Sequence, residues 1–183
     1  MNIKPILFNT DMVRAILDGR KTVTRRLIKQ NVDAVLSSPF HEKYPEMPDA
    51  QIITKLCMPP YQLGDILYVR ETFAQVAKHI FWYRADNAEY TKGILWKPSI
   101  HMPKEAARIF LKVKDVRVER LQEITDEQAE KEGCSDYTST ALGFCYLWDS
   151  TIRKSDLDYY GWAADPWVWV IEFERCEQPS EWL

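Results

Sequence analysis

The sequence predicts an α+β domain that is rich in strands and carries a few short helices. Residues 108–120 alternate between apolar and polar side chains, which is the pattern of a half-buried strand. Tryptophans alternate in the same way in a second predicted strand at 167–173. Of the 183 residues, 46% are hydrophobic, which is enough for one core of ordinary size, so we expect a single domain over 1–183.

The first predicted helix covers 10–17, with Thr10 as its N-cap and Gly19 just beyond its last turn. Its buried stripe consists of three apolar residues, Val13, Ile16 and Leu17. The chain then becomes extended, so the basic segment 18–26 leads from a helix into a strand.

Several features are predicted between this segment and the middle of the chain. Prolines interrupt 36–60 repeatedly, and this predicts an irregular surface insertion there. Strands are predicted at 66–72 and 80–85. Within 108–120 the apolar positions change phase at Asp115, which predicts a β-bulge.

Two further helices are predicted in the second half. Thr125 and Gln128 have the spacing of a capping box, so the first of these helices should begin at Asp126 and end before Gly133. The second is predicted over 141–150, where four residues follow helical spacing.

The net charge of −3, from 24 basic and 27 acidic residues, argues against broad, non-specific affinity for nucleic acid. A local basic patch is nevertheless indicated, because six cationic residues fall within sixteen positions: Arg14, Arg20, Lys21, Arg25, Arg26 and Lys29. Such a patch suits a modified nucleoside, a nucleotide or a short single-stranded RNA better than a long duplex.

The composition also argues against several kinds of site. The four cysteines, Cys57, Cys134, Cys145 and Cys176, show no Cys-x-x-Cys spacing, so neither a zinc knuckle nor a disulfide framework is indicated. The histidines are isolated in sequence, and we expect no metal and no cofactor. The chain has no apolar run of about 18 residues and no apolar N-terminal stretch, so we expect a cytoplasmic monomer without a membrane partner.

Lys21 and Thr24 place an amine and a hydroxyl three residues apart in the basic segment. In a regular strand they would point to opposite faces, so they can converge only if Lys21 sits on the turn that precedes the strand. A desolvated lysine with a lowered pKa can act as a general base for such a hydroxyl. The alternative is that the segment is a solvated basic surface.

Glu132, at the end of the predicted helix that begins at Asp126, could orient the lysine or balance its charge. The sequence alone leaves three other acids of the same helix open: Asp126, Glu127 and Glu130. Each could equally be a solvent-facing surface acid.

Other candidates would bind the substrate. Arg70 and Glu71 end a predicted strand and could contact a phosphate or a base edge, as could Arg26, although Arg70 and Glu71 could equally form a structural salt bridge. Trp96 and His101 lie in or next to a proline-flanked loop and could stack on a base. The alternative for Trp96 is that it packs this loop onto the core.

Four segments, in their order and spacing, resemble the motifs of ASCH domains, which are small β-barrels of the PUA-like type. The matching segments are 18–26, 64–71, 121–133 and 167–173. With 96–103 inserted before a strand, the chain looks most like the longer members carried by bacteriophages and prophages. The resemblance implies a PUA-like small barrel with short flanking helices and long loop insertions.

The resemblance also implies catalytic residues. In ASCH proteins that hydrolyse N4-acetylcytidine, the catalytic group is a lysine and a threonine of the motif Gly-Arg-Lys-Thr-x-Thr and a glutamate of the short helix. The matching positions are Lys21, Thr24 and Glu132. This chain departs from those compact enzymes in its length and in Arg25, which stands where an apolar residue would follow the threonine.

Three functions are therefore open. The first is an amidohydrolase acting on N4-acetylcytidine or a related acylated nucleobase, in which Thr24 or a water attacks the acyl group and Lys21 takes the proton. The second is a non-catalytic module that binds RNA or a modified base. The third, weaker option is a metal-assisted ribonuclease. Because 36–60 and 83–103 would add aromatic and basic side chains around the mouth of the site, we expect a ligand larger than a nucleoside.

Overall fold

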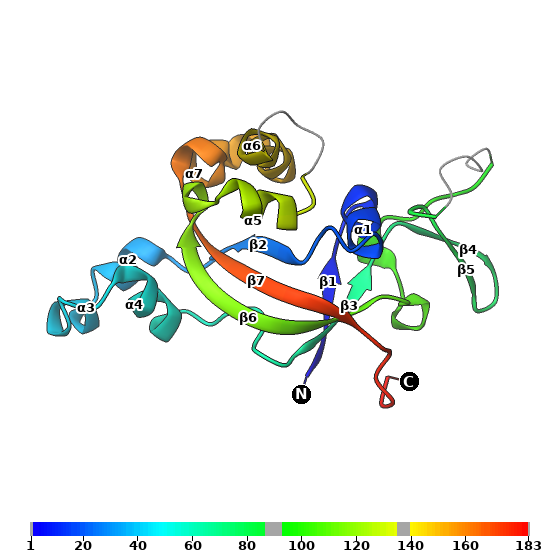
Figure 1. Ribbon diagram of the computed structural model, residues 1–183, viewed down its shortest axis with the longest axis horizontal. Helices are drawn as coiled ribbons and strands as arrows, with labels where there is room; N and C mark the ends of the chain where they lie inside the picture. Colours follow the sequence, from blue (N-terminus) through cyan, green and yellow to red (C-terminus); the bar gives the residue numbers. More distant parts are fainter. Residues whose placement is uncertain (1, 87–92, 135–139, 183) are drawn as a thin grey trace.

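The computed structural model describes residues 2–86, 93–134 and 140–182, which form a mixed α+β fold around a five-stranded sheet. The strands follow the order β1 (Ile3–Leu7), β3 (Ile66–Arg70), β6 (Phe110–Arg120), β7 (Trp167–Cys176) and β2 (Val23–Leu27). β1 runs parallel to β3, and the other neighbours are antiparallel. Figure 1 shows β6 and β7 curving together through the middle of the molecule.

The sheet is open rather than closed into a barrel. β1 and β2 lie at its two edges, and no backbone ladder joins them in the described residues. A side chain bridges the two edges instead, because Nη2 of Arg26 on β2 donates to the carbonyl of Leu7 at the end of β1, 2.9 Å away. The prediction of a strand-rich α+β fold is confirmed, whereas the closed small barrel is not.

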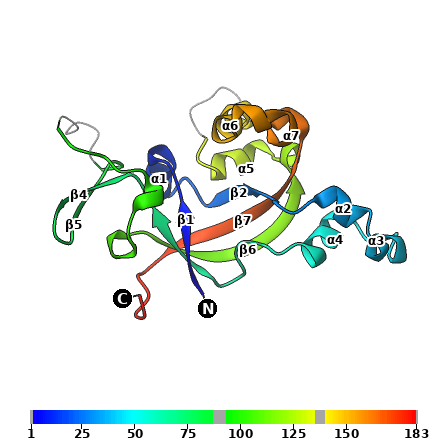
Figure 2. The ribbon, with the colours of Figure 1, turned by 180° about the vertical axis from the view of Figure 1, so that it is seen from behind.

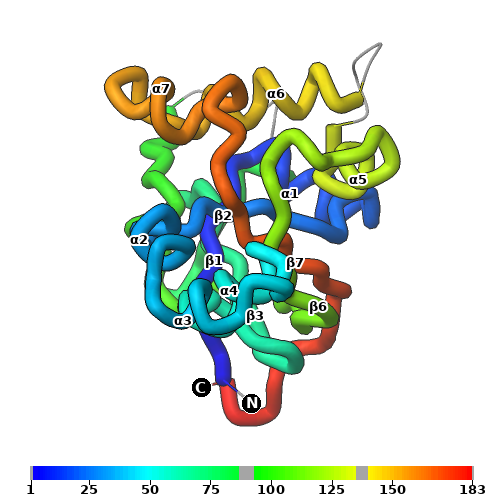
Figure 3. Tube along the Cα trace, turned by 90° about the vertical axis from the view of Figure 1, so that its left-hand side faces the viewer, coloured from blue at the N-terminus to red at the C-terminus, as the bar shows by residue number. Residues whose placement is uncertain are grey.

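Helices α5 (Asp126–Lys131), α6 (Thr140–Thr151) and α7 (Leu157–Tyr160) form a layer above β2 and β7 (Figures 1 and 3). The predicted capping box at Thr125 and Gln128 is confirmed, since each side chain accepts from the other's backbone N–H. The predicted helix over 141–150 is confirmed as α6.

The first predicted helix is confirmed as α1 (Thr10–Leu17), but its N-cap is Asn9 rather than Thr10. The Asn9 side chain accepts from the backbone N–H of Met12 at 2.9 Å, the bond that defines the cap. Ala15 is buried on this helix, while Leu17 is only half-buried.

The segment 36–60 is not irregular, so that prediction is wrong. With the residues just before it, the segment forms α2 (Val32–Leu36), α3 (Pro39–Lys43) and α4 (Asp49–Leu56). Pro39 occupies the first turn of α3 and Pro48 is the N-cap of α4. At these positions a backbone N–H would make no hydrogen bond within the helix, so proline is tolerated there. Ile53 of α4 belongs to the main core, so this segment is part of the folded domain.

The predicted strands are largely confirmed. The pairing of β6 with β7 shifts register between Val113 and Asp115, which is the expected bulge. β3 and β5 (Ile80–Tyr83) match the two shorter predictions, whereas β1 and β4 (Phe73–Ala77) were not predicted. β4 and β5 form a separate hairpin at the opposite end of the molecule from α2 to α4 (Figure 2). Short 3-10 helices connect the elements: η1 (Ser99–His101), η2 (Lys104–Ala106), η3 (Leu121–Glu123), η4 (Lys154–Asp156) and η5 (Trp162–Ala164).

Alternate residues of β7 serve two cores. Trp169, Ile171 and Phe173 belong to the main core, whereas Val168 and Val170 pack with α6 in a second core. The four cysteines, all within the described residues, form no disulfide. In the parts of the chain that the structure describes, no helix has the length and apolar character needed to cross a bilayer.

Candidate functional site

Lys21 lies on the turn between α1 and β2, before the alternation of the strand begins. Its backbone N–H donates to the carbonyl of Ala15 at 2.9 Å, and β2 starts at Val23. The buried Nζ donates to Glu132 Oε2 at 2.6 Å, to the carbonyl of Val23 at 2.7 Å and to the carbonyl of Glu132 at 2.9 Å. Because an ammonium carries three hydrogens, this arrangement uses every donor of a charged lysine.

A glycine allows Glu132 to reach the lysine. Glu132 is the C-cap of α5, and Gly133 follows it with a φ of +91°. A Cβ at Gly133 would lie 2.9 Å from Cβ of Ala15, so a larger residue would push α5 away from α1. Glycine is therefore required here both by the backbone conformation and by the close approach of the two helices.

Arg25 was not predicted as a site residue, yet it holds the other oxygen of the same carboxylate. Its Nη1 lies 3.2 Å from Glu132 Oε1, and its Nη2 lies 3.0 Å from Glu119 Oε2 and 2.8 Å from Gln128 Oε1. We call Lys21, Arg25, Glu119 and Glu132 the charge cluster; its two cations and two carboxylates balance. The sequence signal was that strand alternation places Arg25 on the same face as Val23, where a charge needs a buried partner.

The environment of Lys21 changes its acidity. Burial lowers the pKa of the Lys21 ammonium, and the adjacent Glu132 carboxylate opposes this lowering. The positive charge of Arg26 lowers the pKa further. The net direction is downward, so Lys21 gives up its proton more readily than an exposed lysine does.

A cavity of about 330 Å³ adjoins the charge cluster. It lies between the end of β1, the strand β2, residues 98–99 and helix α6, and both Thr24 and Glu132 line it. Within the described ranges, the Thr24 hydroxyl makes no hydrogen bond, so it is available to a ligand. The lining also includes the aromatic side chains of Phe8, Phe144 and Trp148. Lys21 stands behind this lining and meets the cavity through Glu132.

Arg26, which the sequence analysis proposed as a substrate-binding residue, lines the same cavity. In addition to its bond to the Leu7 carbonyl, its guanidinium lies 5.3 Å from the centre of the Phe8 ring. A fixed cation at the wall can contact a developing negative charge or a carbonyl of a bound ligand.

Arg70 and Glu71 do not line this cavity. Arg70 donates through Nε to the carbonyl of Met102 at 3.0 Å and through Nη2 to the carbonyl of Ile100, so it anchors the loop that follows residue 98. Glu71 is buried and bound by both Nε and Nη2 of Arg108, at 2.9 and 3.1 Å. Burial raises the pKa of Glu71, and Arg108 opposes this rise. Glu71 therefore forms a salt bridge, but with Arg108 rather than Arg70.

Trp96 and His101 also lie away from the cavity. Lys97 pairs with Phe73 of β4 through two backbone hydrogen bonds of 3.1 and 2.7 Å, which places the neighbouring Trp96 beside that strand. His101 is exposed at the end of η1, and the loop contributes Pro98 and Ser99 to the cavity in its place.

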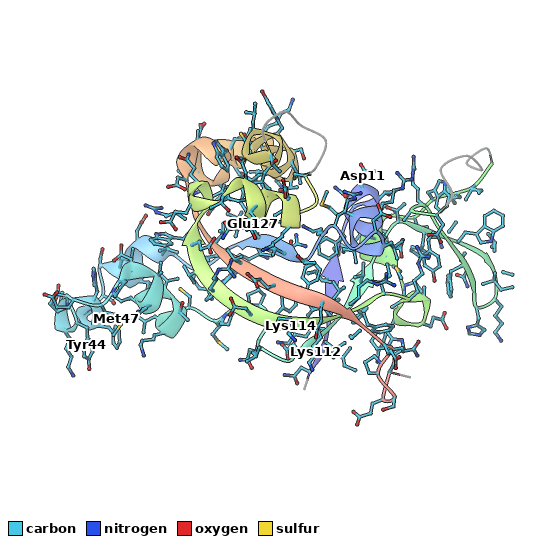
Figure 4. The ribbon with its side chains drawn as sticks, viewed as in Figure 1. Asp11, Tyr44, Met47, Lys112, Lys114 and Glu127 are labelled. Atoms are coloured by element: carbon cyan, nitrogen blue, oxygen red, sulfur yellow. The ribbon has the colours of Figure 1, made fainter. Side chains whose placement is uncertain are left out.

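The expected aromatic rim from 36–60 is not found at this cavity either. Phe40 and Tyr44 of that segment pack on each other, with ring centres 4.9 Å apart. Tyr44 lies at the far end of the molecule in Figure 4. Of the second expected rim segment, 83–103, residues 87–92 fall outside the described ranges.

The structure separates Glu132 from the other acids of α5. Glu127 pairs with Lys131 at 2.7 Å, and Asp126 accepts from the backbone N–H of Ala141 at 3.0 Å. Among the described residues, no group of three or more His, Cys, Asp and Glu side chains is arranged to hold a metal ion.

The sequence matches no protein-family model and no curated protein. Solved structures do resemble the fold. An ASCH domain from Lactobacillus crispatus JV V101 is 14% identical with a TM-score of 0.47, covering 95% of this chain and 79% of that one. The hypothetical protein PH0355 is 14% identical with a TM-score of 0.46, covering 96% and 100% respectively. Protein EF3133 from Enterococcus faecalis V583 is 10% identical with a TM-score of 0.48, covering 96% and 76%. With TM-scores below 0.5, these likenesses carry no argument about activity.

Proposed function

We propose that this protein is an amidohydrolase that removes the acyl group from N4-acetylcytidine or a related acylated pyrimidine. The observation that carries the proposal is a free Thr24 hydroxyl in a cavity that also exposes Glu132, whose carboxylate holds the buried Lys21 ammonium at 2.6 Å. The motif resemblance described above supports the same three residues.

In the proposed reaction, Oγ1 of Thr24 attacks the acyl carbonyl carbon. Lys21, once its own proton has passed to solvent, takes the hydroxyl proton by way of the Glu132 carboxylate, which lines the cavity. The proton returns by the same way to N4, so that cytidine leaves and the acyl group stays on Thr24. Water then attacks this ester and releases acetate. Alternatively, a water activated by Lys21 attacks the acyl carbonyl carbon directly. This route gives the same products without an ester on Thr24. The lowered pKa of Lys21 favours the neutral amine that both routes need.

The cavity walls suit this substrate. Phe8, Phe144 and Trp148 offer aromatic surface to a pyrimidine ring, and Arg26 offers a cation to the O2 carbonyl of the base. A volume of about 330 Å³ lies at the lower end of the range for small-molecule sites and has room for a pyrimidine base with its acyl group.

Incubating the protein with N4-acetylcytidine tests the proposal, with cytidine and acetate separated by chromatography. Wild type should release both in equal amounts. Thr24→Ala should lose this activity by at least about 100-fold, since it removes the nucleophile. Thr54→Ala, which removes an exposed hydroxyl on α4, should be unaffected. No release by wild type, or unchanged release by Thr24→Ala, would contradict the threonine mechanism. Unchanged release by Thr24→Ala with loss in a lysine variant would favour the water route.

A second candidate is a module that binds the acylated base without turnover. It is favoured by one observation, the three acceptors around Lys21 Nζ, which suit a permanent ammonium. In that case wild type binds N4-acetylcytidine unchanged, and Arg26→Ala weakens binding by about 1–3 kcal/mol. Calorimetric titration followed by chromatography of the recovered ligand separates the two candidates.

A further inference from the structure

A second cavity, of about 420 Å³, shares Arg26 with the first. It is lined by the end of β2 and the residues after it on one side, and by residues 58–61 before β3 on the other. Among the described residues that line it, the polar ones are Arg26, Lys29, Gln30 and Tyr61, and none of the lining residues is a carboxylate. Two cations without an acid suit the binding of an anion.

Arg26 and Lys29 both have donors to offer there. Arg26 uses Nη2 on the Leu7 carbonyl, which leaves most of the five N–H donors of its guanidinium. Lys29 is exposed and makes no ion pair within the described part of the chain. The Tyr61 hydroxyl donates to the carbonyl of Pro5 at 2.9 Å, so its ring is fixed at the wall. Burial raises the pKa of Tyr61 and the charge of Arg26 opposes this rise, which agrees with their closeness.

The two cavities therefore meet at one side chain. With the acyl group at Thr24 and the O2 carbonyl of the base at Arg26, the sugar-bearing nitrogen next to O2 would lie on the Arg26 side, so the rest of the nucleoside would extend toward the second cavity. We propose that the second cavity binds a phosphate group attached to that nucleoside, with Arg26 and Lys29 as its cations. The inference rests on the proposed function, because it takes the first cavity as the base site. The phosphate can be that of a free nucleotide or a phosphodiester of an oligonucleotide.

Calorimetric titration tests this inference. The protein carries Thr24→Ala, and chromatography of the recovered ligands verifies that they are not consumed. The ligands are N4-acetylcytidine, its 5′- and 3′-monophosphates, and a dinucleotide that contains the modified base. At least one phosphate-bearing ligand should bind about fivefold or more tightly than the nucleoside, and this gain should shrink as salt increases. A gain with a monophosphate alone identifies a free nucleotide, and a further gain with the dinucleotide identifies nucleic acid.

Variants test whether the gain in affinity from the phosphate arises in the second cavity. Lys29→Ala should abolish most of this gain and leave the affinity for the nucleoside unchanged. The matched control is Lys112→Ala, which removes an exposed lysine of β6 on the side of the sheet away from α5 and α6 (Figure 4), and it should change neither affinity. Equal affinity for all ligands, an unaltered gain in Lys29→Ala, or no binding of any ligand would overturn the inference. Hydrolysis is read separately, so a wild type that binds phosphate ligands in this way but releases no cytidine would contradict only the proposed reaction.

Discussion

Glu132 is the residue on which the geometry of the candidate site depends. One of its oxygens binds Lys21 and the other binds Arg25, and all three side chains are buried. A buried ion pair adds little net stability compared with apolar side chains of similar size, but removing one partner leaves an uncompensated charge. Removing one member of the charge cluster should therefore destabilise the fold. The intact cluster holds the Glu132 carboxylate in one position in the cavity that Thr24 also lines.

Lys21→Met tests this dependence. The variant keeps the side-chain volume but leaves Glu132 with one cation fewer, so we expect the free energy of unfolding to fall by about 3 kcal/mol. Adding Glu132→Gln removes the excess charge and should recover part of this loss. Urea unfolding measures both, with Lys131→Met, in an exposed pair with Glu127, as a control without measurable effect. A Lys21→Met variant as stable as wild type would mean that the ion pair is not formed.

At the scale of elements, Asp65 joins β1 to the turn before β3. Its carboxylate lies 2.8 Å from Nζ of Lys4 and accepts from the backbone N–H groups of Gln62 and Asn2. Burial raises the pKa of Asp65, but these bonds outweigh burial, so the pKa lies below the ordinary value of 3.8 for an aspartate. The contribution to stability is thus present above pH 3.8 and is lost as the pH falls through the folded pKa.

Asp65→Asn should therefore lower the free energy of unfolding by about 1 kcal/mol near pH 7, and the difference from wild type should shrink as the pH falls below 3.8. Urea unfolding between pH 7 and pH 3 measures it. Asp11→Asn, at an exposed position of α1 (Figure 4), is the control and should show a much smaller difference. A difference that grows toward acid pH would have the wrong sign for this account.

Helix α4 gives a second test at this scale. Ile53 is fully buried in the main core, so Ile53→Ala should cost about 3 kcal/mol through the lost contacts and the cavity it leaves. Leu56→Ala, at an exposed position of the same helix, should cost less than about 0.5 kcal/mol. Thermal or urea unfolding compares the two. Equal, small effects would indicate a loosely attached surface segment, as the proline pattern suggested.

Local patterns predicted the elements whose signals lie within a few residues, such as the bulged strand β6 and the capped helix α5. They failed where the same residue type is compatible with two different structures. Pro39 and Pro48 appear as helix breakers in the sequence, although at the start of a helix they are tolerated. β1 was missed because Pro5 interrupts a short apolar run. β1 is an edge strand that pairs only with β3, and proline is tolerated in edge strands.

Across the whole molecule, the sequence indicated Lys21, Thr24 and Glu132 as candidates and a contact between Lys21 and Glu132, but it did not indicate the contact between Arg25 and the same carboxylate. Glu132 lies 111 residues from Lys21 and 107 from Arg25, so their meeting depends on how α5 packs against α1 and β2. Arg70 and Glu71 were predicted as ligands because strand ends often carry function, yet the fold uses them to hold a loop and to pair with Arg108. Only tertiary packing decides between such roles.

The proposed hydrolysis depends on Lys21 and Glu132, which together handle the proton in the attack by Thr24 or a water. The most direct test is the rate of cytidine release from N4-acetylcytidine by the variant Lys21→Met/Glu132→Gln, at a temperature where unfolding curves show it to be folded. The account predicts release by wild type and a fall of at least about 100-fold in the variant, the usual contribution of a general base. A wild type without activity, or a folded variant that keeps the wild-type rate, would contradict it.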